Sequence, residues 1–127
     1  MTGALQQLRE QGNRFEDIAA DWLQQQGLRL LQRNYRTRCG EIDLIMLEQR
    51  FLVFVEVRSR ANPCYGGAAA TVDWRKQRRI LRSAEAYLKQ NTKFKDLPCR
   101  FDVLAFEPPQ SPGEQRINWI KDAFTDA

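Results

Sequence analysis

The sequence predicts an α/β protein in which a mixed β-sheet is flanked by α-helices, all within one domain. Two segments repeat apolar residues at helical spacing, and five shorter segments are dominated by β-branched and aromatic residues. Their order along the chain is helix, three strands, helix and two strands, which is typical of helices packed on a sheet. The chain, residues 1–127, is long enough for a single domain with a substantial core.

Both helices are predicted from amphipathic spacing and from signals at their ends. The first covers residues 12–26, and Gly27 suits its C-terminus because glycine adopts the left-handed conformation at little cost. The second covers residues 73–90, with Asp73 favourable at its N-terminus. The apolar face of the first helix comprises Phe15, Ile18, Ala19, Trp22 and Leu23. This spacing favours a packing role for Trp22 over base stacking.

Five strands are predicted from short apolar or alternating runs bounded by turn residues. They cover residues 28–35, 40–45, 54–58, 101–106 and 117–120. The small, turn-prone residues 61–71 predict a mobile loop, and residues 108–113 predict another loop. Trp119, in the last strand, is interpreted as a packing residue like Trp22. Asp102 is as compatible with anchoring Arg100 or a loop amide as with chemistry.

A hairpin is the simplest connection between the second and third strands. Residues 48–50 are the only polar break between them, and a turn centred between Gln49 and Arg50 pairs positions whose numbers sum to 99. This register sets Asp43 opposite Glu56. A turn shifted by one residue would send the two side chains to opposite faces.

The predicted register places four charged side chains on one face of the hairpin, with Glu41 opposite Arg58 beside the Asp43–Glu56 pair. Directly opposed residues have Cβ atoms about 5 Å apart, where like charges are destabilising. An acidic pair at that separation needs a compensating cation, and a hard divalent metal bound through oxygen is the natural candidate. Glu41 also has a structural interpretation, as a weak surface ion pair with Arg58.

The composition narrows the chemistry. The chain contains no histidine, which excludes Ser-His-Asp and Cys-His catalysis, histidine-ligated zinc and a histidine general base. A catalytic metal would therefore rest on carboxylates, carbonyls and water, which favours Mg²⁺ or Mn²⁺. Cys39, Cys64 and Cys99 have no C-x-x-C spacing, so we expect reduced thiols and a cytoplasmic protein. No run approaches the roughly 18 apolar residues of a membrane span.

A basic stripe runs along the second predicted helix. It comprises Arg75, Arg79, Arg82 and Lys89. The stripe is poorly neutralised, and with a net charge of +4 and a pI near 9.2 it favours contact with a phosphate backbone. A solvated charged face is the alternative interpretation.

The two acidic strand motifs, at residues 40–45 and 54–58, resemble the paired signature of the YraN family. That family comprises small bacterial proteins of uncertain role that are similar to archaeal Holliday junction resolvases. The resemblance covers nearly the whole chain. Beyond the two strand motifs it includes Glu16 and Ala19 in the first helix, residues 33–36, Lys76 and residues 100–103.

This resemblance implies the restriction-endonuclease-like fold and its PD-(D/E)xK metal site. Asp43 would be the central aspartate, Glu56 the second acid, and Arg58 would occupy the lysine position. Glu16 matches the helical glutamate of such sites, although its position at the edge of the apolar stripe equally fits a solvated side chain.

Two positions depart from the family pattern. Ile42 stands where a proline is usual, and this change has little consequence. Arg58 replaces the motif lysine, and arginine keeps the charge but cannot deprotonate and has a different shape. Lys76, at the start of the second helix, could take over the role of the lysine.

The predicted function is metal-assisted hydrolysis of a DNA phosphodiester, with one or two Mg²⁺ or Mn²⁺ ions held by Asp43, Glu56, Glu16 and the Val57 carbonyl. Arg58 or Lys76 would stabilise the developing charge. Arg75, Arg79 and Arg82 would position duplex or branched DNA without base readout. The analogy with resolvases also suggests a homodimer. The alternatives are a non-catalytic nucleic-acid-binding protein with the same fold and an adaptor in a DNA-processing assembly.

Overall fold

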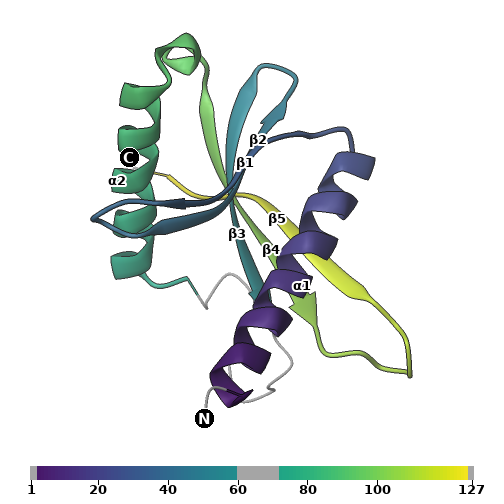
Figure 1. Cartoon of the computed structure of the whole chain (residues 1–127). Coiled ribbons are helices and arrows are strands. Elements are labelled where there is room, and N and C mark those ends of the chain that lie inside the picture. The colour runs from purple at the N-terminus through teal and green to yellow at the C-terminus, as the bar shows by residue number, and fades with distance from the viewer. Residues whose placement is uncertain (1–2, 60–71, 126–127) are drawn as a thin grey trace.

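A five-stranded mixed sheet separates two helices, one on each face, in the computed structural model of the protein (Figure 1). The structure describes residues 3–59 and 72–125, with side chains from residue 14 onward. The helices are α1 (Gly3–Gln25) and α2 (Trp74–Gln90), followed by the short 3₁₀ helix η2 (Thr92–Phe94). The strands are β1 (Arg29–Arg36), β2 (Glu41–Glu48), β3 (Phe51–Ser59), β4 (Cys99–Glu107) and β5 (Arg116–Phe124). The predicted α/β class and element order are confirmed.

The strands lie in the sheet in chain order, from β1 to β5. Neighbouring strands are antiparallel except β3 and β4, which are parallel. Parallel neighbours cannot be joined by a tight turn, and the chain passes through α2 between them. This crossover places the start of α2 near the end of β3, and both contribute to the site described below.

One end of each helix follows its predicted signal, whereas α1 begins at Gly3 and not at the predicted residue 12. Gly27 has a φ of +101°, its N–H donates to Gln24 O (3.0 Å), and Leu28 N donates to Leu23 O (3.1 Å). These two bonds form a Schellman motif that ends α1. At the other helix, Asp73 accepts a hydrogen bond from Lys76 N (2.9 Å) as the N-cap of α2.

The β2–β3 hairpin has the predicted register. Paired residues run from Leu44 with Val55 to Glu48 with Phe51, so that their numbers sum to 99. Gln49, in the turn, has a φ of 54°. The prediction is therefore confirmed over this paired section, which stops one residue short of Asp43 and Glu56.

Each face of the sheet has its own core. The core under α2 includes Tyr35, Ile42, Ile45, Phe54, Ile80, Ala84 and Tyr87. The core under α1 includes Ala19, Leu23, Leu44, Met46, Val55 and Leu104. Residues two apart in a regular strand share a face, yet Ile42 and Leu44 belong to different cores. The alternation of β2 is thus broken at Asp43, which lies between them.

The structure also answers the remaining expectations. The predicted packing role of Trp22 and Trp119 is confirmed, since their rings meet edge to face with centroids 5.7 Å apart. The predicted loop at residues 61–71 lies outside the described residues. In the parts of the chain that are described, neither helix combines the length and apolar character that crossing a membrane requires.

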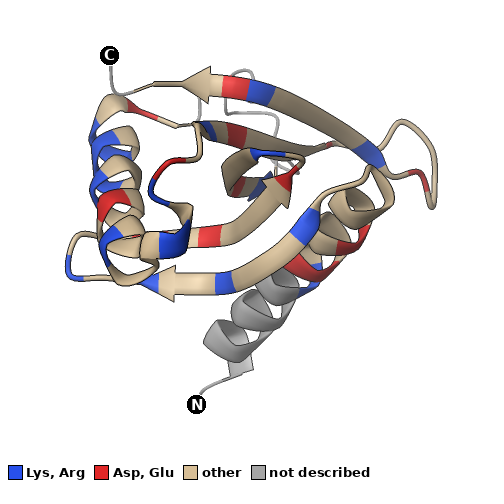
Figure 2. Cartoon of the chain, turned by 90° about the horizontal axis from the view of Figure 1, so that it is seen from above, with Lys and Arg blue, Asp and Glu red and all other residues tan. Residues whose placement is uncertain are grey.

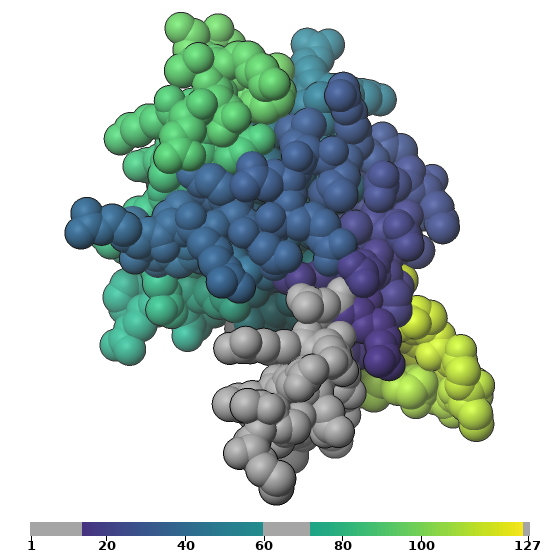
Figure 3. All heavy atoms as spheres, in the orientation of Figure 1, coloured from purple at the N-terminus to yellow at the C-terminus, as the bar shows by residue number. Residues whose placement is uncertain are grey.

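Residues of β1 and of the β1–β2 connection form the middle of the face shown in Figure 3.

Candidate metal centre

Asp43 is the centre of the candidate site. Beyond the paired section of the hairpin, its carboxylate Oδ2 accepts a hydrogen bond from Val57 N at 2.9 Å. A side chain therefore takes the place of a backbone carbonyl in accepting this strand donor. The contact fixes the carboxylate between β2 and β3, and Val57 reaches it through its N–H.

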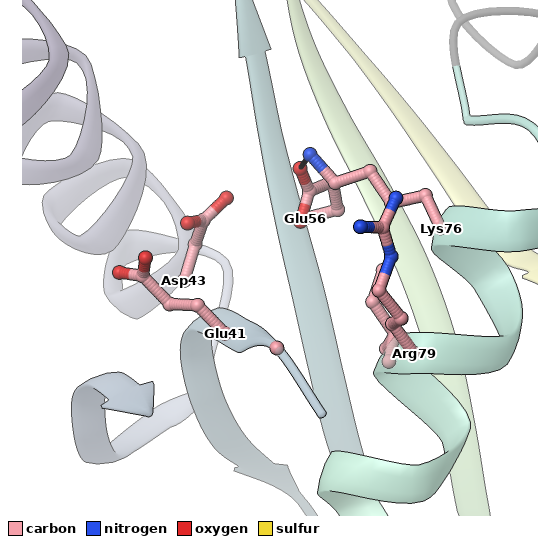
Figure 4. Close-up of a pocket in the computed structure, with 7 residues that line it drawn as sticks. Glu41, Asp43, Glu56, Lys76 and Arg79 are labelled. Carbon is pink, nitrogen blue, oxygen red and sulfur yellow. Dashed lines mark ion pairs between the residues drawn. The ribbon is translucent and has the colours of Figure 1, made fainter. Parts of the chain in front are cut away.

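Three carboxylates from two elements converge beside this point. Oxygen atoms of Glu16 on α1 and of Glu41 and Asp43 on β2 all lie within 4.8 Å of one another. The Glu41 and Asp43 carboxylates lie side by side in Figure 4. Glu41, which the sequence also allowed as a simple partner of Arg58, instead joins this group, and its Oε1 lies 3.8 Å from Arg36 Nε. Hereafter Glu16, Glu41 and Asp43 are called the acidic triad.

The surroundings of Asp43 disfavour its charged form. Removal from solvent, and then the negative charge of Glu56, raise the pKa of Asp43 to about 9; Glu16 adds to the rise and the Val57 N–H opposes it. Without a cation, the carboxyl therefore holds a proton at neutral pH. A bound divalent cation would offset the repulsion and favour the carboxylate. Because every donor is a hard oxygen, the triad fits Mg²⁺ or Mn²⁺.

Two residues of β1 hold the triad in place. Arg33 Nη1 lies 2.6 Å from Asp17 Oδ1, and its Nη2 lies 3.9 Å from Glu16 Oε2, so β1 is tied to α1 beside the triad. Asn34 turns its amide toward the same carboxylates, and the end of the amide that lies 3.0 Å from Glu41 Oε1 is assigned as NH₂ because it faces carboxylate oxygens. Asn34 was not singled out from the sequence. Its signal is conformational, a φ of 51° within a strand, which asparagine tolerates better than most residues.

Glu56 has a different environment from the triad. Its side chain is only 5% exposed, and its Oε1 lies 2.6 Å from Lys76 Nζ and 3.6 Å from Arg58 Nη1. The predicted second acid is therefore paired with two cations. Lys76, whose distance from the acids could not be fixed from the sequence, is in direct contact with one of them.

One pocket joins the acidic and basic groups. It has a volume of about 240 Å³ and is lined by Gly40, Glu41, Asp43, Glu56, Lys76, Arg79 and Ile80. Figure 4 shows the acids of β2 on one side and Lys76 and Arg79 of α2 on the other, with Glu56 between them. An acidic end suited to a cation thus faces a basic end suited to an anion.

The close approach of β2 and α2 forms this pocket. A Cβ atom at Gly40 would lie 3.2 Å from Arg79 Cβ, closer than side chains ordinarily pack, so a glycine is needed there. Thr37, in the β1–β2 connection, hydrogen-bonds to Ser83 Oγ at 2.9 Å. Together these contacts seat the start of β2 against α2.

The outer face of α2 is basic (Figure 2). Arg75, Arg79 and Arg82 are exposed, and of these Arg79 also lines the pocket. Trp74, at the start of the helix, is 63% exposed with the Arg75 guanidinium 5.5 Å from the centre of its ring. The predicted stripe is therefore accessible and continuous with the pocket.

The fold and the site define a mixed α/β protein with an acidic, oxygen-donor centre between α1 and strand β2 of its sheet. The chain belongs to the uncharacterised protein family UPF0102, whose family model matches residues 15–106. The resemblance to the YraN family is thereby confirmed. The match begins just before Glu16 and includes all the residues of the pocket.

Relatives match over most of their own length. A UPF0102 protein of Alcanivorax borkumensis is 48% identical over 113 residues, which is 89% of this chain and 90% of the relative. One of Saccharophagus degradans is 48% identical over 116 residues, 91% of this chain and 93% of the relative. One of Pseudomonas aeruginosa is 41% identical over 116 residues, with the same two shares. These similarities establish the family and assign no activity.

Proposed function

We propose that the protein is a metal-dependent nuclease that hydrolyses phosphodiester bonds of DNA. The observation that carries this proposal is the pocket, in which Glu41 and Asp43 of the acidic triad face Lys76 and Arg79 across the buried Glu56. A phosphodiester needs a cation on one side and donors to its oxygens on the other. The two ends of this pocket meet both needs.

The acidic triad would hold the metal. Glu16, Glu41 and Asp43 offer oxygen ligands from two elements that β1 ties together, so the ligands need little rearrangement. Bound there, Mg²⁺ or Mn²⁺ would supply activation of water and stabilisation of the negative phosphate. Glu56 stays a candidate ligand from the sequence, and its pairing with Lys76 supports a positioning role instead.

Lys76 is the strongest candidate for the missing motif lysine. It is a compact ammonium group, 36% exposed toward the pocket, and Glu56 fixes it through a 2.6 Å contact. It would contact a phosphate oxygen or the attacking water, as the family lysine is expected to do. Arg58 contacts the same carboxylate oxygen at a longer 3.6 Å. Its role would be to share the charge of Glu56 and to add positive potential.

The basic face of α2 would position the DNA backbone. Arg79 connects the pocket to the exposed Arg75 and Arg82, so a strand whose phosphate enters the pocket would continue along the helix. Such contacts carry no base specificity. Replacing the three arginines with glutamine should flatten the dependence of log affinity on log salt by roughly 0.9 for each lost contact. Arg29, Lys93 and Lys95, exposed cations outside α2, provide a control triple variant.

The test is cleavage of labelled duplex and branched DNA with Mg²⁺ or Mn²⁺, using wild type, Asp43→Asn and Asp96→Asn prepared in parallel. Asp96 is an exposed aspartate outside the pocket and controls for the loss of one charge. Cleavage by wild type and Asp96→Asn, abolished by Asp43→Asn or by EDTA, supports the proposal. DNA binding without cleavage in either metal would favour the non-catalytic alternative. Cleavage that survives Asp43→Asn would point to a contaminant or to another site.

A further inference from the structure

Asn34 has a backbone conformation that its place in the sheet does not require. Three non-glycine residues among those the structure describes have positive φ: Asn34, Gln49 and Asp122. Gln49 lies in the hairpin turn, whereas Asn34 lies within β1 between Arg33 and Tyr35, both of which keep regular pairing with β2. A left-handed residue inside a paired strand is unfavourable and persists only where other contacts hold it.

The contacts of Asn34 lead to the acidic triad. One end of its amide lies 3.1 Å from each carboxylate oxygen of Glu16 and 3.0 Å from Glu41 Oε1, and we assign this end as the NH₂ group because the swapped orientation lets it donate to these carboxylate oxygens. The β1–β2 register also sets Asn34 across from Asp43, because Arg33 pairs with Leu44 and Tyr35 with Ile42. The amide therefore touches two members of the triad and faces the third. The side chain is exposed, so it has room to rotate.

We propose that Asn34 is a fourth ligand of the metal in this site, and that its amide turns over when the cation binds. This inference rests on the metal centre of the proposed function. Rotation by about 180° exchanges the positions of the amide nitrogen and oxygen, since the two ends have nearly the same shape. The NH₂ donor that bridges the two carboxylates in the metal-free protein is then replaced by an oxygen that would bind the ion together with them.

The distances fit this exchange. Adjacent ligands of six-coordinate Mg²⁺, each about 2.1 Å from the ion, lie about 3.0 Å from one another. The amide end of Asn34 already lies 3.0–3.1 Å from oxygens of Glu16 and Glu41. The same position thus serves as a hydrogen-bond donor site without the ion and as a ligand site with it. The left-handed φ of Asn34 aims the side chain at this position.

A purely structural role for Asn34 predicts the opposite response to its removal. If the NH₂ only relieved repulsion between Glu16 and Glu41, the cation would have to displace it, and deleting it would tighten metal binding. If Oδ1 is a ligand, deleting it weakens metal binding. The sign of the change therefore separates the two roles, without any measurement of cleavage.

The experiment is calorimetric titration with Mn²⁺ alone, in the absence of DNA, on wild type, Asn34→Gly and Gln49→Gly. Glycine accepts the left-handed φ at both positions, and Gln49 is an exposed amide in the hairpin turn. Asn34→Gly is expected to weaken Mn²⁺ binding by roughly tenfold or more, in the range found when groups that support a metal site are removed. Gln49→Gly should bind as wild type does.

Asn34→Asp provides an independent check. Aspartate keeps an oxygen at the same position and also tolerates the left-handed conformation. It should bind Mn²⁺ at least as tightly as wild type, and weaker binding would overturn the inference. Unchanged or tighter binding by Asn34→Gly would also overturn it, while leaving the metal centre in place. Absence of Mn²⁺ binding by wild type would remove the metal centre itself, and with it both proposals.

Discussion

Asp43 and Asp102 are aspartates of the same sheet with opposite surroundings. Asp102 is fully buried and accepts four hydrogen bonds, from Arg100 Nε (2.9 Å) and Nη2 (3.0 Å), Trp119 Nε1 (2.9 Å) and Asp122 N (2.9 Å). Asp43 is partly buried, accepts a backbone hydrogen bond from Val57 N (2.9 Å), and faces other carboxylates. Asp102 thus accepts four hydrogen bonds from cationic and neutral donors, whereas Asp43 accepts one from the backbone and lies among like charges.

The cationic side of the Asp102 network is satisfied as well. The third guanidinium contact of Arg100 goes to Glu48 Oε1 at 2.7 Å. Burial alone would lower the pKa of Arg100, and the hydrogen bonds to Asp102 and Glu48 outweigh it and raise the pKa. A fully satisfied polar network specifies structure, whereas a buried acid left among like charges is typical of functional sites. Asp102 therefore has a structural role in holding the sheet together, whereas the surroundings of Asp43 are those expected of a functional residue.

The largest expected effect separates the two residues by stability. Asp102→Ala would leave Arg100 buried beside a missing partner, so it should lower the free energy of unfolding by about 3–5 kcal/mol. The loss should be the same with and without Mg²⁺, because Asp102 and Arg100 lie outside the pocket lined by Glu41 and Asp43. Urea denaturation measures it. A loss below about 1 kcal/mol, within the range of an exposed ion pair, would break the comparison.

The next effect is the response to metal. Mg²⁺ or Mn²⁺ at about 100 times its Kd should stabilise wild type by about 2.7 kcal/mol, because the cation binds the folded site and not the unfolded chain. Asp43→Asn should abolish this gain and leave the metal-free protein as stable as wild type or more so, since a repelled acid is removed. Melting curves in EDTA and in metal provide the measurement, with Asp96→Asn as control. An unchanged metal response in Asp43→Asn would move the site away from Asp43.

The pH dependence should also distinguish Asp43. Its pKa is about 9 in the folded protein against 3.8 for a solvated aspartate carboxyl, so between these values the folded state binds more protons than the unfolded state. The contribution of Asp43 to stability must then fall as pH rises through this window, with a slope no steeper than about 1.4 kcal/mol per pH unit. Metal-free wild type should lose stability from pH 6 to pH 9, relative to Asp43→Asn. Parallel curves for the two proteins would contradict the burial of an acidic Asp43.

The sequence identified the scaffold better than it identified the site. The hairpin register followed from the position of a two-residue turn, and the end of α1 and the start of α2 followed from Gly27 and Asp73, because these are local effects of chain geometry. Asp102 anchors Arg100, as the structural interpretation predicted, and the amide that it also holds, Asp122 N, lies in β5 and not in a loop.

Which residues come together in the site depends on tertiary packing, which no local sequence pattern encodes. Glu16 reaches Asp43 only because α1 packs across the sheet, and Lys76 reaches Glu56 only because the crossover returns α2 to the end of β3. Glu41 becomes part of the site because strand alternation is broken at Asp43, and Asn34 becomes part of it because its backbone is left-handed within β1. Strict strand alternation would place Asp43 opposite Glu56 and Glu41 opposite Arg58, and the sequence-based prediction rested on it. In the structure, Asp43 instead belongs to the acidic triad, whereas Glu56 is neutralised by Lys76 and Arg58.

The smallest expected effect comes from a third aspartate, which extends the comparison to an exposed position. Asp73 is satisfied by the N–H of Lys76, and this hydrogen bond, with smaller contributions from Arg75 and Arg79, lowers its pKa. A lowered pKa means that its contribution to stability is present at neutral pH and is lost as pH falls through the folded value. Asp73→Ala should lower the melting temperature by a few degrees through loss of the cap. Asp73→Asn should keep most of that stability, because asparagine caps helices about as well.

Neither change should alter the metal response, since Asp73 is outside the triad. If Asp73→Ala removed the metal-induced stabilisation, the first turn of α2, which carries Lys76, would be part of the metal centre, and the division between scaffold and site would have to be redrawn.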